Sequence, residues 1–379
     1  MQRPCLRLLF LAAALTLLAP TPASAGQKAA TGNSGGAAAA DTPGAGAETD
    51  DSSSPSYDGG THVPFRATLF PLLSLPSSSV RDLVPSYAIN LIGRNYALKG
   101  LELGLVFNSE RTYVDGAQFA TAGNWVGGSA RGVQGALALN VSDRLAGVQA
   151  TLGGNVVAND TDGVQIGSLN WSGGELEGTQ LGLANAAGDV TGFQGGLLNV
   201  GGEVDGLQAG LLNIAEKSDV SLGLVNINWA RPAWGATWVN EQGMLSAGLQ
   251  HGSKHVYHML RVGYQPFQPQ QVLAPGIGFG GHFPLGALGP ASSYLETEAV
   301  YNVAIPLATR SHTPSHWGQL RMTFGVAFGR RLAAFAGVSA NGLKADRRGR
   351  VLSPPDELVW VESDHGTGFW PGFYGGIRF

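Results

Sequence analysis

Apolar and polar residues alternate with a period of two inside a short phrase that recurs from residue 100 to residue 226. In one copy, Leu181 and Leu183 lie on one side of the chain, and Gln180 and Gly182 lie on the other, as in a β-strand. Turn residues follow each copy. The alternation therefore predicts one strand of about nine or ten residues per copy.

The phrase has the form Gly-x-Gln-x-Gly-Leu-x-Asn, and its first glycine marks the start of each copy. Successive starts of the clearest copies lie 15, 14 and 14 residues apart, and in the earlier copies the Asn falls one residue later. A fixed period indicates one structural unit used repeatedly, and this one is too short for a pair of helices, which needs more than about thirty residues. The clear copies begin at Gly163, Gly178, Gly192 and Gly206, and the earlier ones at Gly100, Gly116, Gly132 and Gly147.

Two architectures suit such units. In a membrane β-barrel, consecutive copies run antiparallel with their apolar face toward lipid and their polar face toward the lumen. In a β-solenoid, the copies stack in parallel and the fixed Asn forms a side-chain ladder. A tilted membrane-spanning strand needs roughly 9–11 residues, which is close to the length of each copy. In the barrel the lumen-facing residues are Gln165, Gln180, Gln194 and Gln208.

Alternating segments continue after the repeats, for example at 259–264, 294–305 and 319–328, with aromatic residues near their ends. Charged residues make up 13% of the chain, about half the usual share, and no apolar run approaches the ~20 residues of a membrane helix. We therefore predict an all-β protein, a transmembrane antiparallel β-barrel of about 16–20 strands over 61–379, with the repeats as consecutive strands. The alternative is a β-solenoid for the repeats followed by a C-terminal barrel.

The N-terminus has the pattern of a secretory signal peptide, with a basic start, an apolar stretch and small residues before a cleavage point after Ala25. The single cysteine, Cys5, lies inside this segment, so the mature chain has no thiol for disulfides or metal binding. Residues 26–60 are mostly Gly, Ala, Ser, Thr and Asp, and they predict a disordered linker. Export to the outer membrane is the expected localisation.

The last residues place Phe373, Ile377 and Phe379 on one face of an alternating segment. This ending resembles the C-terminal strand of bacterial outer-membrane barrels. The resemblance implies that these residues form an assembly signal that the barrel assembly machinery recognises. Pro371 and Gly375 depart from the pattern, which prefers larger apolar side chains there.

The segment from Val63 to Trp229, with its Gly-x-Gln-x-Gly-Leu-x-Asn copies, also resembles the bacterial surface repeat-containing protein family. That resemblance implies a surface or envelope location and no particular catalytic activity. The longer Gly-to-Asn spacing in the early copies departs from the regular form.

Candidate catalytic and metal-binding groups are few. His251, His255 and His258 have helical spacing but flank a predicted hairpin turn, so a solvated turn is favoured over a metal site. His312 and Ser315 share a loop and give a distant alternative, a lipid hydrolase at a barrel rim, without an assignable third group. Acidic residues recur in the turns without the regular spacing of a calcium-binding repeat.

The predicted function is that of an outer-membrane surface protein, a passive pore or a structural scaffold, and not an enzyme. The alternative is an adhesin-like binding module built on a solenoid. No cofactor is expected. The expected partners are outer-membrane lipid and the assembly machinery. Removing Arg3 and Arg7 from the 23 basic residues leaves 21 against 27 acidic ones, which offers no support for nucleic-acid binding. The oligomeric state, the solute and the strand count stay open.

Overall fold

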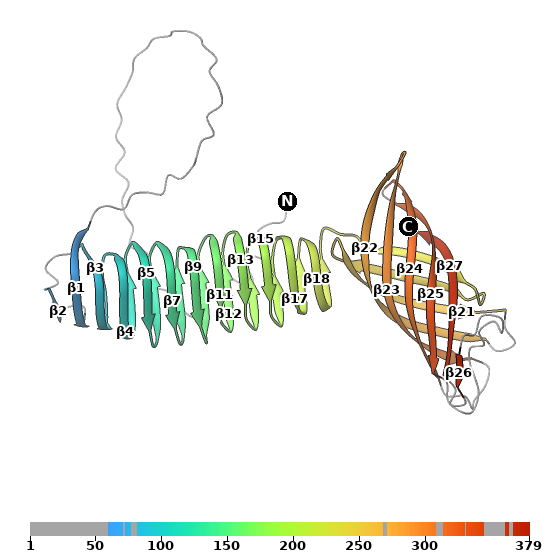
Figure 1. Ribbon diagram of the computed structural model, residues 1–379, viewed down its shortest axis with the longest axis horizontal. Coiled ribbons are helices and arrows are strands. Elements are labelled where there is room, and N and C mark those ends of the chain that lie inside the picture. Colours follow the sequence, from blue (N-terminus) through green and yellow to red (C-terminus); the bar gives the residue numbers. More distant parts are fainter. Residues whose placement is uncertain are drawn as a thin grey trace, which may run out of the picture. The chain divides into compact units, whose positions relative to one another are not determined.

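The computed structural model describes residues 60–70, 73–76, 82–267, 271–307, 314–329, 331–344, 361–363 and 367–379. The described residues form two β-sheets (Figure 1). None of their segments is a helix long and apolar enough to cross a membrane. The predicted signal peptide, and the predicted linker up to residue 59, lie outside the described residues. The all-β class predicted from the sequence is confirmed for the part of the chain that is described.

The first sheet is a β-solenoid of about nine turns that contains all the repeats. Apart from β1 and β2, which are antiparallel, its strands pair in parallel. Figure 1 shows them stacked side by side along the repeat region. The strands are β1 (Thr61–Phe70), β2 (Leu73–Leu75), β3 (Leu83–Ile92), β4 (Leu98–Glu110), β5 (Tyr113–Ala120), β6 (Gly123–Val126), β7 (Ser129–Ala136), β8 (Leu139–Ser142), β9 (Arg144–Thr151), β10 (Gly154–Val157), β11 (Thr161–Ile166), β12 (Leu169–Ser172), β13 (Leu176–Leu181), β14 (Ala184–Ala186), β15 (Val190–Gly195), β16 (Leu198–Val200), β17 (Glu203–Ala215) and β18 (Lys217–Asn228).

Equivalent residues of successive copies lie directly above one another in the solenoid. Gln165 pairs with Gln180 in the parallel ladder between β11 and β13, and Asn170 pairs with Asn185 between β12 and β14. The prediction that the repeats are antiparallel membrane strands is therefore wrong, and the solenoid alternative fits. An alternation of period two does not distinguish the two, because strands of either orientation place successive side chains on opposite faces.

A glycine with positive φ opens each copy. At Gly163 φ is 140°, and a Cβ added there would lie 2.0 Å from the carbonyl oxygen of Gly147 in the coil before. Only glycine tolerates such an approach in this region of φ. The fixed glycine of the repeat is therefore a requirement of close stacking between coils.

The length of a coil changes along the solenoid. Asn108 is hydrogen-bonded to the Asn 16 residues later, whereas Asn213 is bonded to the one 13 residues later. The coils therefore shorten toward the C-terminal end of the repeat region. Between them lie coils of 15 and 14 residues.

The second sheet is antiparallel and closes on itself. Strand β19 pairs with β20 on one side and with β27 on the other, so eight of its described strands form a ring, and short β26 pairs with β27 only. The predicted single barrel over 61–379 with about 16–20 strands is thus replaced by a solenoid that ends at Asn228 and a smaller barrel. The strands are β19 (Trp234–Asn240), β20 (Leu245–Gly252), β21 (Val256–Gln265), β22 (Val272–Leu288), β23 (Ala291–Pro306), β24 (Ser315–Phe328), β25 (Leu332–Lys344), β26 (Val361–Ser363) and β27 (Thr367–Arg378).

Candidate binding surface

The inside of the solenoid contains a ladder of glutamines. The amide of Gln180 donates from Nε2 to Oε1 of Gln165 at 2.8 Å, and Gln194 donates to Gln180 at 2.8 Å. Each amide offers both a donor and an acceptor, so identical residues satisfy one another when they stack. The four glutamines predicted to face a barrel lumen, Gln165, Gln180, Gln194 and Gln208, are fully buried in the solenoid, 0% exposed.

A second ladder consists of the asparagines that end each copy. Nδ2 of Asn170 donates to Oδ1 of Asn185 at 2.8 Å and to the backbone carbonyl of Leu181 at 2.8 Å. The next Asn repeats both bonds in the following coil, where Asn185 donates to Asn199 and to Gly195. The asparagine is therefore fixed in the repeat because it links the side chains of two coils and also binds the backbone. Buried polar groups that are satisfied in this way do not carry a desolvation penalty.

Two carboxylates interrupt the neutral interior at the N-terminal end of the solenoid. Glu102 occupies the register position of the ladder glutamine, opposite Gln118, and Glu110 lies beside it. Both side chains are buried, and Asn95 donates to each of them, at 2.8 and 3.1 Å. Burial, followed by the charge of Glu102, raises the pKa of Glu110 well above its ordinary value. This pair was not predicted from the sequence, although the copy at Gly100 has Glu where the other copies that open with glycine have Gln.

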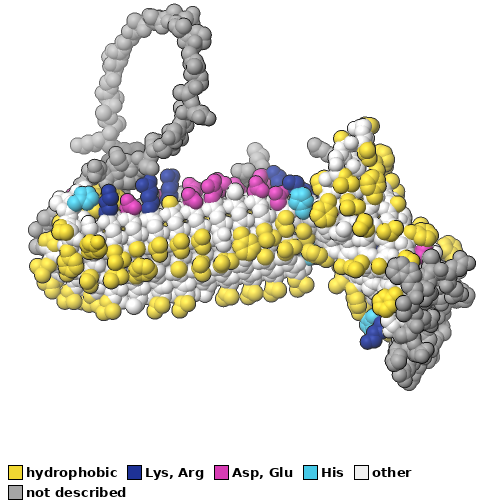
Figure 2. Space-filling model, viewed as in Figure 1, with side chains coloured by type: hydrophobic (Ala, Val, Ile, Leu, Met, Phe, Trp, Pro, Cys, Tyr) yellow, Lys and Arg dark blue, Asp and Glu magenta, His cyan; other side chains and the backbone are white. Residues whose placement is uncertain are grey.

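Charged residues of the solenoid gather along one edge, where the turns between copies lie (Figure 2). In the later coils these turns are acidic, and their side chains also support the turn: Asp160 Oδ1 accepts from the backbone N–H of Glu175 at 3.1 Å, and Asp189 accepts from Glu203 at 2.9 Å. Among the described residues, no group of three or more potential ligands could hold a metal ion. The charged residues of the early coils at this edge are Lys99, Arg111, Asp115, Arg131, Asp143 and Arg144. Those of the later coils are Asp160, Asp162, Glu175, Glu177, Asp189, Glu203, Asp205, Glu216 and Lys217.

Away from the charged edge the solenoid exposes apolar rows (Figure 2). One row stands at the corner between the two arms of each coil, three residues after the ladder glutamine. Its leucines are between 54% and 77% exposed. They are Leu105, Leu137, Leu152, Leu183, Leu197, Leu211 and Leu224.

The barrel also places apolar side chains outside and polar ones inside. On β24, Leu320 is 67% exposed and Met322 is 51% exposed, whereas Arg321 between them is 5% exposed. The residues predicted as an assembly signal, Phe373, Ile377 and Phe379, are all exposed on the outer side of the barrel. Their proposed role in assembly stays a prediction.

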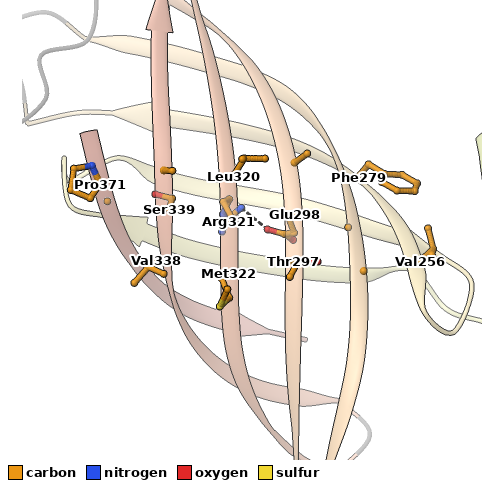
Figure 3. A pocket seen from close by; sticks show the side chains of 15 residues that line it. Val256, Phe279, Thr297, Glu298, Leu320, Arg321, Met322, Val338, Ser339 and Pro371 are labelled. Atoms are coloured by element: carbon orange, nitrogen blue, oxygen red, sulfur yellow. Dashed lines mark ion pairs between the residues drawn. The ribbon is translucent and has the colours of Figure 1, made fainter. Parts of the chain in front are cut away.

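The inside of the barrel is filled by a charged network. Arg321 Nη1 lies 3.2 Å from Glu298 Oε2, on the neighbouring strand, and Figure 3 shows this ion pair in the barrel wall. The hydroxyl of Tyr257 donates to Glu298 at 2.7 Å, and the Arg321 guanidinium stacks on the ring of Tyr374 at 3.9 Å. An eight-stranded barrel has an interior that side chains can fill.

A second part of this network joins other strands. Arg378 near the end of β27 forms an ion pair with Glu296, which is also in contact with His282 at 2.8 Å. These residues were not predicted as a site from the sequence. The available signal was a charge between two apolar neighbours, as in Leu260-Arg261-Val262 and Leu320-Arg321-Met322.

Of the histidines and the serine considered for chemistry, His251 and His258 are brought together as cross-strand partners on β20 and β21, but the described residues contain no metal-binding group of three. His258 contacts the amide of Asn226, His255 contacts the carbonyl oxygen of His282, and His251 accepts from the backbone N–H of Asn228. Ser315 is fully buried in β24. Its suggested partner His312 lies outside the described residues.

No protein-family model matches the chain. No curated protein matches it either. Among solved structures, part of the chain is similar to the crystal structure of Neisserial surface protein A (NspA), with 14% identity and a TM-score of 0.25. That match covers 38% of this chain and 91% of the other.

Proposed function

We propose that this chain is an outer-membrane surface protein in which the barrel is a membrane anchor and the solenoid is an adhesin-like binding module. The observation that carries the proposal is the distribution of polarity in the barrel. Arg261, Glu298 and Arg321 are buried inside it, while Leu260, Leu320 and Met322 are exposed outside. Exposing such a large apolar surface to water is unfavourable and leads to association, whereas the same surface is stable in contact with lipid.

The filled interior supports an anchor over a pore. Trp317 stacks on Trp370 at 6.3 Å, and Arg261 lies 5.0 Å from the ring of Trp238 and donates to Gln319 at 2.7 Å. A polar lumen that conducts solutes needs more strands or an unfilled centre. The pore predicted from the sequence is therefore the less favoured function.

The solenoid supports the binding role. Its ladders hold successive coils in one register, so its outer surface presents the same positions repeatedly over about nine turns. The edge carries charges of both signs in the early coils, where Asp115 lies between Lys99 and Arg131, and it is mainly acidic in the later coils, which suits a long partner of complementary charge. The resemblance of the repeats to the surface repeat-containing family supports an envelope location.

The anchor is tested by moving a charge onto the barrel wall. Leu320→Arg should cost roughly 2–4 kcal/mol when the protein is refolded into lipid vesicles, because the position faces hydrocarbon. Leu320→Val is the matched control and should fold like the parent. The readout is the fraction that migrates as a folded, heat-modifiable band. A parent chain that folds equally well in buffer without detergent or lipid would overturn the anchor.

Surface display is tested separately on intact cells. A short epitope inserted after Asn159, in an exposed turn of the charged edge, should be accessible to antibody without permeabilising the cells. A solenoid that faces the periplasm would be stained only after permeabilisation, and that result would contradict the adhesin-like role while leaving the anchor intact.

A further inference from the structure

The apolar side of the solenoid consists of three neighbouring rows without a charged residue. The rows pass through all the coils from Leu103 to Val225, and the parallel registers align them. The first row follows the ladder glutamine, the second is the leucine corner, and the third precedes the ladder asparagine. We call these three rows the leucine face. The first row is Leu103, Phe119, Gly135, Ala150, Ile166, Leu181, Gly195, Ala209 and Leu222. The second row is Leu105, Thr121, Leu137, Leu152, Ser168, Leu183, Leu197, Leu211 and Leu224. The third row is Phe107, Gly123, Leu139, Gly154, Leu169, Ala184, Leu198, Leu212 and Val225.

An apolar surface of this length is unusual for a part of a protein that stands in water. Single exposed leucines are ordinary, but contiguous apolar patches larger than a few hundred Å² mark interaction or membrane surfaces. Coils stacked about 4.8 Å apart make the leucine face roughly 40 Å long. Its charged counterpart, the edge that holds Asp162, Glu177 and Asp205, lies at the other side of each coil (Figure 2).

The leucine face is continuous with the outer wall of the barrel. Leu224, the last member of the corner row, lines the same surface cavity as Leu260, Ile277 and Phe279, which are exposed on β21 and β22. The barrel residues belong to the wall that the proposed function places in lipid. The apolar side chains of that wall therefore meet the end of the leucine face in one cavity, where the polar group His258, in contact with Asn226, lies beside them.

The composition of the leucine face suits lipid better than a protein partner. Protein interfaces concentrate their binding energy in Trp, Tyr and Arg, and leucine is under-represented at such positions. Most positions of the leucine face are Leu, Ala or Gly, and its larger side chains Phe107, Phe119 and Ile166 are also purely apolar, so it offers a partner few polar groups to recognise. Partition into lipid needs only apolar area on one side and charged groups on the other.

On these grounds we propose that the leucine face of the solenoid lies on the lipid surface of the membrane that the barrel spans, with the charged edge in water. This inference rests on the proposed function, because it needs the barrel to be in the membrane. It adds a second membrane-contacting surface to the same chain. The solenoid then lies along the membrane instead of projecting from it.

The test uses single cysteines, since the only natural one, Cys5, precedes the expected cleavage point. Mature protein carrying Leu183→Cys or Leu211→Cys is labelled with an environment-sensitive fluorophore and refolded into phosphatidylcholine–phosphatidylglycerol vesicles. Some vesicles contain lipid with a nitroxide near the headgroup. Glu177→Cys, on the charged edge, is the aqueous control, and Leu320→Cys is the control for the barrel wall. All four side chains are solvent-exposed, so the substitutions should be tolerated.

The probes at 183 and 211 should lose about half of their fluorescence in nitroxide vesicles, as expected for groups at the headgroup and acyl boundary, while the probe at 177 should change little. If these two probes behave like the one at 177 while the probe at 320 is quenched, the inference fails and the barrel anchor stands. If the probe at 320 is not quenched, the proposed function itself fails. Probes that are shielded from water but unquenched, and that cross-link between molecules, would show a second copy on the leucine face and would also overturn the inference.

Discussion

The solenoid and the barrel both bury polar side chains and expose apolar ones, but their buried polar groups find hydrogen-bond and ion-pair partners in opposite ways. In the solenoid, parallel coils place each residue against its own kind, and neutral amides such as Gln165 and Gln180 are suited to that contact. In the barrel, different side chains meet across the interior, and Glu298 finds Arg321 and Tyr257. Identical charges stacked one coil apart would repel, so successive coils can stack amides but not carboxylates, and the ladder carboxylate Glu102 lies opposite an amide, Gln118. The way the strands pair therefore determines which polar side chains can be buried.

The largest effect is expected from breaking the charged network of the barrel. Glu298→Ala should cost about 3–5 kcal/mol of barrel stability, because it leaves Arg321 buried without its carboxylate. Thr297→Ala, on the outer side of the same strand, is the matched control. Urea unfolding in lipid vesicles, followed by the heat-modifiable band, measures the loss. An equal response from both variants would mean that the network contributes nothing specific.

A smaller effect, confined to the other region, is expected at a repeat glycine. Gly163→Ala should cost about 3 kcal/mol of solenoid stability, because alanine disfavours a φ of 140° and its Cβ would meet the carbonyl oxygen of Gly147. Gly154→Ala is the control, since its nearest neighbour would lie 3.5 Å away. Limited proteolysis of the repeats reports on the solenoid. The heat-modifiable barrel band should be the same in both variants, and a change there would show that the two regions fold as one unit.

One broken rung of the amide ladder should cost less. Gln180→Leu removes the partner of Gln165 and Gln194 and leaves an acceptor and a donor unpaired, for a loss of about 2 kcal/mol. Thr179→Val, the outward neighbour, is the control. Amide hydrogen exchange should increase in the coils on both sides of residue 180. Unchanged exchange would indicate that the ladder hydrogen bonds form as a result of the fold and do not stabilise it.

The smallest effect depends on pH. The pKa of Glu110 is raised because it is buried beside Glu102, so the folded protein keeps a proton that the unfolded chain loses above the ordinary carboxyl pKa. Stability should therefore fall as the pH rises from that ordinary pKa through the raised one. Glu110→Gln should flatten the dependence and make the solenoid relatively more stable at neutral and higher pH. Glu177→Gln, at an exposed edge, is the control. The measurement is a series of melting curves recorded across pH. If both variants matched the parent at every pH, Glu110 would not have a raised pKa in the folded protein.

The sequence predicted an all-β repeating unit and, for the solenoid alternative, the asparagine ladder. It was wrong in predicting one strand of about nine or ten residues per copy, because one copy contains two strands, Thr161–Ile166 and Leu169–Ser172, with a corner between them. It placed the glutamines in a barrel lumen, whereas they lie inside the solenoid. It did not predict the direction of strand pairing, because the alternation is the same for both. A usable signal was the extra residue of the early copies. In a membrane strand one inserted residue reverses all later faces. In the solenoid the insertion is absorbed at the corner, where residues 151–153 stand opposite 167–168. The barrel network joins residues far apart in sequence, and no local pattern pairs Glu296 with Arg378.

The gradual shortening of the coils has a consequence for how the chain finds its register. A stack of identical coils could shift its register by one whole repeat and still form every side-chain hydrogen bond of the two ladders. Here the Asn-to-Asn distance falls from 16 to 13 residues along the solenoid. A slipped coil would bring a longer loop against a shorter one and leave its corner unmatched. Because coils of 16, 15, 14 and 13 residues follow one another in blocks, a slip of the whole stack mismatches the coils at each change of length, and this disfavours the slipped alignments of a repetitive sequence.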